Sequence, residues 1–268
     1  LFNLTAKPLF RLRSAAALAM RMIGASYMFR LKPHFSFYGL QQQPPDAAQQ
    51  AVAQTLRWHQ KMRARLFAGH QTAAPTVAAV ISRPAINYRG AALEQSDWSL
   101  EIGGDWLVTT AQSLGAPSVI VSAANLSPAT MAEQLGPWLQ VLLLQNTTVL
   151  PRDAAEAVAR FAEGGGTVIS SADSGTLDEL GRPLPLAERR LPVQPGAWGQ
   201  GRMILAPHAP ALPQEATAAL VAASWQVLGA GNKSDWQLLP YVQPATGSSP
   251  ARVLLHALYL GTASGFQP

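Results

Sequence analysis

The sequence predicts an α/β fold in which helices cover a doubly wound parallel sheet. The first observation is a complete strand-helix-strand unit between residues 137 and 182. The second is that short apolar runs alternate with helical stretches through the middle of the chain, which is typical of parallel crossovers. The third is composition: of the 268 residues, 48% are hydrophobic and 13% are charged, which is ample material for a core.

The strand-helix-strand unit carries local signals that agree throughout. The apolar run 141–144 predicts a strand, and Pro151 suits the first turn of the helix predicted over 151–163. The apolar residues of this helix share one face. Three glycines, 164–166, can adopt the left-handed backbone conformation that ends a helix, and the second apolar run follows at 167–169. The unit therefore predicts a parallel crossover.

The remaining elements of the sheet follow from the same signals. A helix is predicted over 98–114, where Trp and Ile recur at every fourth position. Gly103 and Gly104 in its middle each lower the helix stability by on the order of 1 kcal/mol. The Pro- and Gly-rich stretch 183–200 predicts a loop. The predicted strands are 76–81, 117–122, 139–144, 166–170 and 202–206, and the predicted helices are 98–114, 128–136 and 151–163.

The N-terminal segment predicts helix, strand and helix. A short helix begins at Ser14, a strand covers 33–38, and a long amphipathic helix follows Pro44 and ends before Gly69. This order of elements is expected of the C-terminal part of a (β/α) barrel. Residues 71–75 are predicted to be a linker.

The C-terminal segment predicts a helix over 214–229 and then a β segment over 236–260 that turns at 247–250. The expected division is 1–70, a barrel remnant; 71–212, the doubly wound domain; and 213–268, a helix with the start of a small β domain. The first residue is Leu1, and the last segment stops without a closing element, so we expect a fragment of a longer protein.

Several stretches together resemble a known family. They resemble the degenerate class I glutamine-amidotransferase-like, flavodoxin-like domain that follows the catalytic barrel in β-galactosidases with a trimerisation domain. The family has a strand ending in "vlvlPn", a helix ending in "GG", a strand "tlv" and a loop "G.tsl.de.G". The matching stretches are 141–146, 164–169 and 174–182, with further matches at 58–69, 77–82, 199–204 and 252–258.

The resemblance implies an accessory and assembly role in a glycoside hydrolase. In that family the domain packs beside the barrel and helps form an oligomer, commonly a trimer, and both catalytic glutamates lie on earlier barrel strands. Glycoside hydrolysis needs two carboxyl groups that flank the bond. Residues 1–45 contain no Asp or Glu, so no catalytic residue is assigned to this chain. Phe37 and Tyr38, at the end of the predicted strand, are candidate sugar-stacking residues, with plain packing as the alternative.

Two other functions stay open. A stand-alone serine hydrolase would need Ser170, Ser171 or Ser174 within hydrogen-bond reach of His208 or another histidine. A carbohydrate-binding or scaffolding module would need no such pair. The chain has no cysteine, no paired-histidine motif and no complete phosphate-binding glycine motif, so neither a metal nor a cofactor is expected.

Charge is divided unevenly along the chain. Residues 1–70 carry ten Lys and Arg against one Asp, a balance of +9, whereas residues 71–268 carry ten against fourteen acids, a balance of −4. Without a recognised binding motif, the basic block favours a missing acidic partner surface over nucleic acid. No apolar run reaches the roughly 18 residues of a membrane helix. We therefore expect contact with neither nucleic acid nor membrane. A cytoplasmic location is expected, with an extracytoplasmic one left open, and the family resemblance implies a homo-oligomer.

Overall fold

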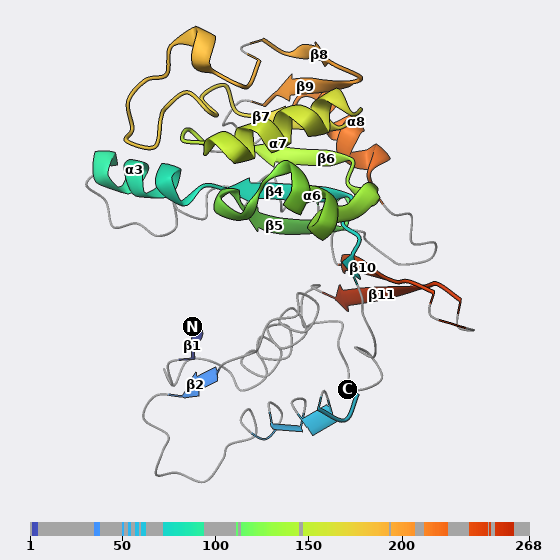
Figure 1. Cartoon of the computed structure of the whole chain (residues 1–268). Helices are drawn as coiled ribbons and strands as arrows, with labels where there is room; N and C mark the ends of the chain where they lie inside the picture. Colours follow the sequence, from blue (N-terminus) through green and yellow to red (C-terminus); the bar gives the residue numbers. More distant parts are fainter. Residues whose placement is uncertain are drawn as a thin grey trace.

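The computed structural model describes residues 2–4, 35–37, parts of 50–62, 72–93, 111, 114–144, 147–192, 194–206, 212–224, 236–245, 247 and 250–259. Its largest unit is a six-stranded sheet in the order β5-β4-β6-β7-β9-β8 (Figure 1). Five of these strands are parallel, and β8 joins β9 antiparallel at one edge. The strands are β4 (Val77–Ile81), β5 (Ser118–Ser122), β6 (Val141–Leu144), β7 (Thr167–Ser170), β8 (Gly196–Trp198) and β9 (Gly201–Leu205).

The order of the five parallel strands is the flavodoxin-like one. Counted along the chain they lie 2-1-3-4-5, which is the doubly wound arrangement in which ligands bind outside the carboxyl ends of the strands. In the register of these strands, Val77 of β4 lies opposite Val141 of β6, and Val141 lies opposite Thr167 of β7. The predicted α/β fold class is confirmed, and each of the five predicted strands agrees with an observed strand to within two residues at either end.

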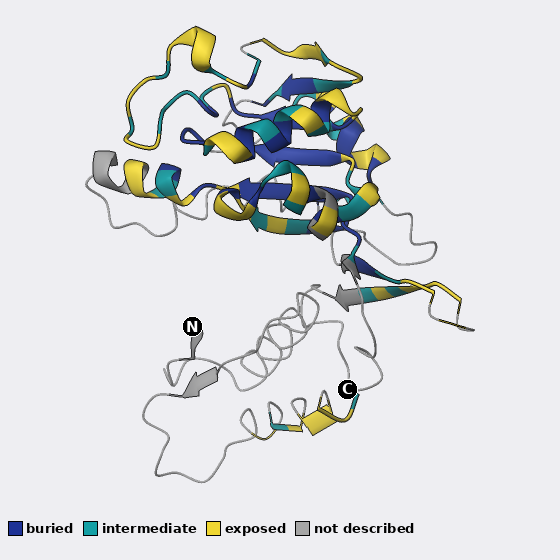
Figure 2. Cartoon of the chain, viewed as in Figure 1, coloured by how far each residue is buried: buried dark blue, intermediate teal, exposed yellow. Residues whose placement is uncertain are grey.

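Two apolar clusters cover the two faces of the sheet. Alternate residues of β4 and β6 face opposite sides, so Ala78 and Leu142 belong to one cluster, and Val77 and Val141 to the other. Helices α6 (Pro128–Leu135) and α7 (Arg152–Glu163) pack on the first face, and α8 (Gln214–Ala222) packs on the second (Figure 1). Figure 2 shows burial concentrated on β4, β6 and the inner side of α7.

Local sequence explains where these helices begin and end. Ser127 and Thr130 form a reciprocal capping box at the start of α6, with Pro128 in the first helical turn. Pro151 precedes α7, and Arg160 near its end is bonded to Glu156 at 2.7 Å. The chain leaves α7 through Gly165, whose φ of +108° favours glycine.

A second, three-stranded sheet joins distant parts of the chain. β3 (Thr72–Ala73) pairs antiparallel with β10 (Trp236–Gln243), which pairs with β11 (Arg252–Tyr259). Leu239 and Tyr241 are buried here and pack against Val119 of β5. The expected β segment near the C-terminus is therefore a hairpin, and part of the expected linker 71–75 is a strand.

The N-terminal segment contributes one parallel pair, β1 (Phe2–Leu4) beside β2 (Phe35–Phe37). β2 lies within the predicted strand 33–38, whereas β1 was not predicted. A parallel pair suits two neighbouring strands of a barrel, but the described residues form no closed barrel. The predicted helices over 14–24 and 44–69 lie largely outside the described residues.

Several short elements depart from the sequence prediction. α3 (Arg83–Leu93) was missed because its sequence, RPAINYRGAAL, carries no strong apolar stripe at helical spacing, and Gly90 weakens the pattern further. The predicted loop 183–200 holds the short strand β8 and a 3-10 turn, η3 (Leu186–Glu188). Two further 3-10 turns, η1 (Ala123–Asn125) and η2 (Gly136–Trp138), flank α6. Of the predicted helix 98–114, only Ala111 and Leu114 are described.

Helix α8 shares the core of the six-stranded sheet through Ala216, Ala219 and Leu220. The predicted helix 214–229 is observed as far as Ala222, and residues 225–229 lie outside the described residues. The predicted division placed this helix with the C-terminal segment. The domain boundaries themselves stay a prediction.

Candidate functional site

Buried hydroxyl groups gather at the carboxyl ends of the central parallel strands. Ser82 follows β4, Thr147 follows β6, and Ser170 is the last residue of β7, with Ser171 and Ser174 just beyond. All five residues are buried, and Ser170 is 0% exposed. In a doubly wound sheet this edge is the usual position for a ligand. The cluster is therefore the first candidate for a functional site.

A chain of hydrogen bonds connects these hydroxyls. Thr147 Oγ1 donates to Ser174 Oγ at 3.0 Å, and Ser174 Oγ donates to the carbonyl of Leu144 at 3.1 Å. The hydroxyls of Ser171 and Ser174 lie 2.9 Å apart. Ser82 Oγ donates to the carbonyl of Val149. The hydroxyls thus fasten the loops after β4, β6 and β7 to one another.

This arrangement gives the three candidate serines structural partners. Ser170 Oγ donates to the carbonyl of Ser171 at 3.0 Å, so it too bonds to backbone. His208, the base that the serine-hydrolase alternative requires, lies outside the described residues. His256 lies on β11, where its ring meets Tyr241 edge-on at 5.1 Å between centroids. The described geometry brings no histidine to the serines.

Of the two candidate sugar-stacking residues, only Phe37 belongs to the described part of the chain. Phe37 is the last residue of β2, in the separate parallel pair, and Tyr38 lies outside the described residues. Their proposed role stays a prediction. Within the described ranges no group of three His, Asp or Glu residues lies close enough to hold a metal ion.

The loop after β7 contains a tight turn built around Asp178. Its carboxylate accepts from the backbone N–H of Leu180 at 2.9 Å and of Arg182 at 2.8 Å, and from Arg182 Nε at 2.7 Å. The backbone N–H of Arg182 lowers the pKa of Asp178 most, helped by the Arg182 guanidinium and opposed by burial. Gly181, with φ of +77°, allows the ring of Tyr88 to lie against the turn.

From the sequence alone, the adjacent acids Asp178 and Glu179 are expected to be solvated loop charges. For Asp178 this prediction missed the turn that it organises. The spacing Asp178, Gly181, Arg182 was the available signal, because Asp accepts from backbone two residues on and Gly tolerates positive φ.

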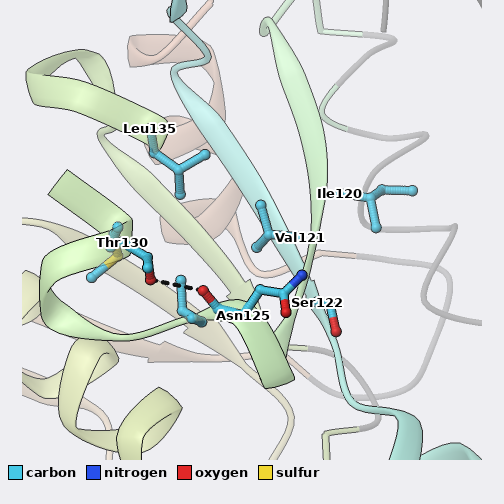
Figure 3. A pocket seen from close by; sticks show the side chains of 8 residues that line it. Ile120, Val121, Ser122, Asn125, Thr130 and Leu135 are labelled. Carbon is cyan, nitrogen blue, oxygen red and sulfur yellow. Dashed lines mark hydrogen bonds between the residues drawn. The ribbon is translucent and has the colours of Figure 1, made fainter. Parts of the chain in front are cut away.

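Two cavities border this end of the molecule. The larger, about 690 Å³, lies between the start of α7 and the loop 175–191 after β7. The smaller, about 160 Å³, lies between β5 and α6, with Thr130 donating to the carbonyl of Asn125 at 2.7 Å (Figure 3). Ile120 points away from the other labelled side chains of this pocket and is 52% exposed.

Comparison with known proteins gives matches among solved structures. No family model matches the chain, and no curated protein matches it. The apo exo-carrageenase GH42 from Bacteroides ovatus is similar over 94% of this chain and 40% of its own, at 10% identity and a TM-score of 0.51. In fold, this chain is similar to that enzyme.

Two β-galactosidases also match. The enzyme from the Antarctic haloarchaeon Halorubrum lacusprofundi matches over 80% of this chain and 43% of its own, at 12% identity and a TM-score of 0.48. The enzyme from Bacillus circulans sp. alkalophilus matches over 52% and 19%, at 15% identity and a TM-score of 0.38. The chain thus spans between about a fifth and two fifths of these structures.

Proposed function

We propose that this chain is the accessory and assembly part of a β-galactosidase-like glycoside hydrolase. The observation that carries the proposal is the extent of the similarity: 94% of this chain corresponds in fold to 40% of the exo-carrageenase. The chain therefore matches a large part of a longer enzyme. Glycosidic bond hydrolysis, a carbohydrate substrate and a cytoplasmic location belong to the proposed parent protein.

Three of the described carboxylates, those of Glu156, Asp178 and Glu215, are engaged in ion pairs, which fits an accessory role. A glycosidase general acid needs a raised pKa, whereas the pKa of Asp178 is lowered. Glu156 and Glu215 are paired with Arg160 and Arg202 on the surface. Phe37 and Tyr38 are retained in the proposal as contacts to sugar in the parent enzyme.

Activity of the purified chain tests the proposal directly. We expect no hydrolysis of aryl β-galactosides, with a full-length β-galactosidase assayed beside it as the positive control. Light scattering should show a homo-oligomer, for which a trimer is the expected state. Unaided turnover of a glycoside by this chain would contradict the accessory role.

The gene itself offers a second test. We expect the reading frame upstream of Leu1 to encode roughly seven further βα units, with two glutamates at the ends of barrel strands. A start codon directly before Leu1 would contradict the proposal.

The serine-hydrolase alternative makes a different prediction for simple esters. If one of the buried serines were a nucleophile, the chain would hydrolyse p-nitrophenyl esters, and replacing that serine would abolish the reaction. The hydrogen bonds of Ser171 and Ser174 to structural partners favour no turnover.

A further inference from the structure

Three arginines border the larger cavity at the carboxyl edge of the sheet. Arg152 is the first residue of α7, and Arg189 and Arg190 lie in the loop after η3. The cavity has a volume of about 690 Å³, large enough for a small organic molecule. Leucine side chains supply its apolar lining; these are Leu150, Leu177, Leu184 and Leu191.

The guanidinium groups of these arginines have no carboxylate partner within the described part of the chain. The ion pairs there join Glu156 to Arg160, Asp178 to Arg182, and Glu215 to Arg202. Arg189 Nε donates to the carbonyl of Leu184 at 3.3 Å, which holds its side chain in place. Arg189 is thus held by a backbone carbonyl, and Arg152 and Arg190 are exposed at the cavity without a carboxylate partner in the described ranges.

The acidic residues of the same lining leave a positive excess. Asp178, Glu179 and Glu188 also line the cavity, but Asp178 is already bonded to Arg182. With Arg182 counted beside its partner Asp178, four guanidinium groups stand against three carboxylates around the cavity, a balance of +1. This local sign is opposite to that of residues 71–268 as a whole, which carry −4.

The position of the cavity strengthens the case for a ligand. Its lining residues come from the connection between β6 and α7, the first turns of α7 and the loop after β7. These elements meet at the carboxyl edge of the sheet (Figure 1), where doubly wound sheets bind ligands. The start of α7 has no side-chain cap, so its first peptide N–H groups add a favourable field for an anion. Asp153 shares this first turn but does not line the cavity.

We propose that this cavity binds a small organic ligand through an oxyanion group, a carboxylate, sulfate or phosphate. Planar guanidinium groups recognise such groups with paired, charge-assisted hydrogen bonds. The leucines would contact the apolar part of the same ligand. This binding site is additional to the proposed accessory role and does not depend on it.

Titration of the full chain with defined anions tests the site. Citrate, acetate, inorganic phosphate and sulfate are each added at constant ionic strength, and binding is followed by calorimetry and by the melting temperature. We expect saturable binding of at least one of them, with chloride at the same ionic strength giving none. The preferred anion identifies the oxyanion.

Matched variants locate the binding. The double variant R152Q/R190Q should weaken binding about tenfold or more, because each lost charge-assisted bond lowers the affinity about threefold or more. The control R202Q, which removes an arginine outside the cavity, should bind like the wild type. Should the double variant fail to fold by circular dichroism, R190Q alone, which alters an exposed residue, should still weaken binding about threefold or more.

Three outcomes would overturn the proposal: no saturable binding of any of the four anions, equal binding by the cavity variant and the control, or an effect of chloride equal to that of the other anions. Any of these would leave the arginines as ordinary surface charges. None of them would bear on the accessory role, which is tested by glycoside turnover.

Discussion

At the scale of single residues, Ser174 is the centre of the hydroxyl chain at the carboxyl edge. It accepts from Thr147 and donates to the carbonyl of Leu144. We predict that S174A lowers the free energy of unfolding by about 1–3 kcal/mol, because buried partners lose their hydrogen bonds. S224A, at a less buried residue after α8, should stay within about 0.5 kcal/mol of the wild type. Urea denaturation measures both, and equal effects would contradict the structural role.

Asp178 gives the loop after β7 a predictable pH dependence. Its pKa is lowered in the folded chain, so its contribution to stability is complete above the ordinary aspartate pKa and is lost as the pH falls through the folded value. We predict that the melting temperatures of wild type and D178N differ at pH 7 and converge below about pH 4. A difference that stays constant from pH 7 to pH 3 would be inconsistent with this origin.

Gly201 marks a close approach of two backbone segments. A Cβ atom there would lie near the carbonyl oxygens of Gly166 and Ala162, the latter at 2.5 Å, and neither can move as a side chain would. We predict that G201A costs about 3 kcal/mol, the upper part of the range for overpacking. G165A adds only backbone strain, of about 1–2 kcal/mol, because nothing lies within 4 Å of its Cβ position. Equal losses in thermal unfolding would argue against the clash.

At the scale of elements, β6 is the central strand of the core. Leu142 is 0% exposed, whereas Leu180, on the turn after β7, is 76% exposed. We predict that L142A costs about 2–5 kcal/mol and that L180A changes stability by less than about 0.5 kcal/mol. Chemical denaturation of the two leucine variants tests this, and a smaller loss for L142A than for L180A would contradict the assigned core.

The elements that could be predicted from sequence are those whose signals repeat. β6 and α7 combine an apolar run, a first-turn proline and a glycine stop, and their observed bounds follow the prediction closely. α3 has no strong apolar stripe, and β8 has only three residues, so neither shows a clear period. β3 is a strand because a segment far along the chain pairs with it, a long-range cause that local sequence does not contain.

The candidate site was less predictable than the fold. The hydrogen-bond partners of the small-residue turn after β7 come from β6 and Thr147, which the local sequence does not indicate. The cavity bordered by Arg152 and Arg190 joins residues almost forty positions apart, and no motif links them. Sequence identifies residue types, whereas the cavity depends on which loops meet at the sheet edge.

At the scale of the whole molecule, both faces of the parallel sheet and the hairpin draw their described core residues from 73–254. We predict that residues 72–259, expressed alone, unfold in one cooperative thermal transition by circular dichroism. Removing β10 and β11 as well should lower the melting temperature, because Leu239 and Tyr241 no longer cover Val119. A non-cooperative melt of the longer fragment would contradict this assignment.

β3 precedes the strands of the six-stranded sheet along the chain, and β10 follows them. Their pairing therefore brings the two ends of that segment side by side. Ala73 lies opposite Tyr241, and the N–H of Ala74 donates to the carbonyl of Pro240 at 2.8 Å. The intervening unit is therefore joined to the rest of the chain by two adjacent segments. Domain insertion into another protein, or circular permutation, at these segments would leave the internal connections of the unit unchanged.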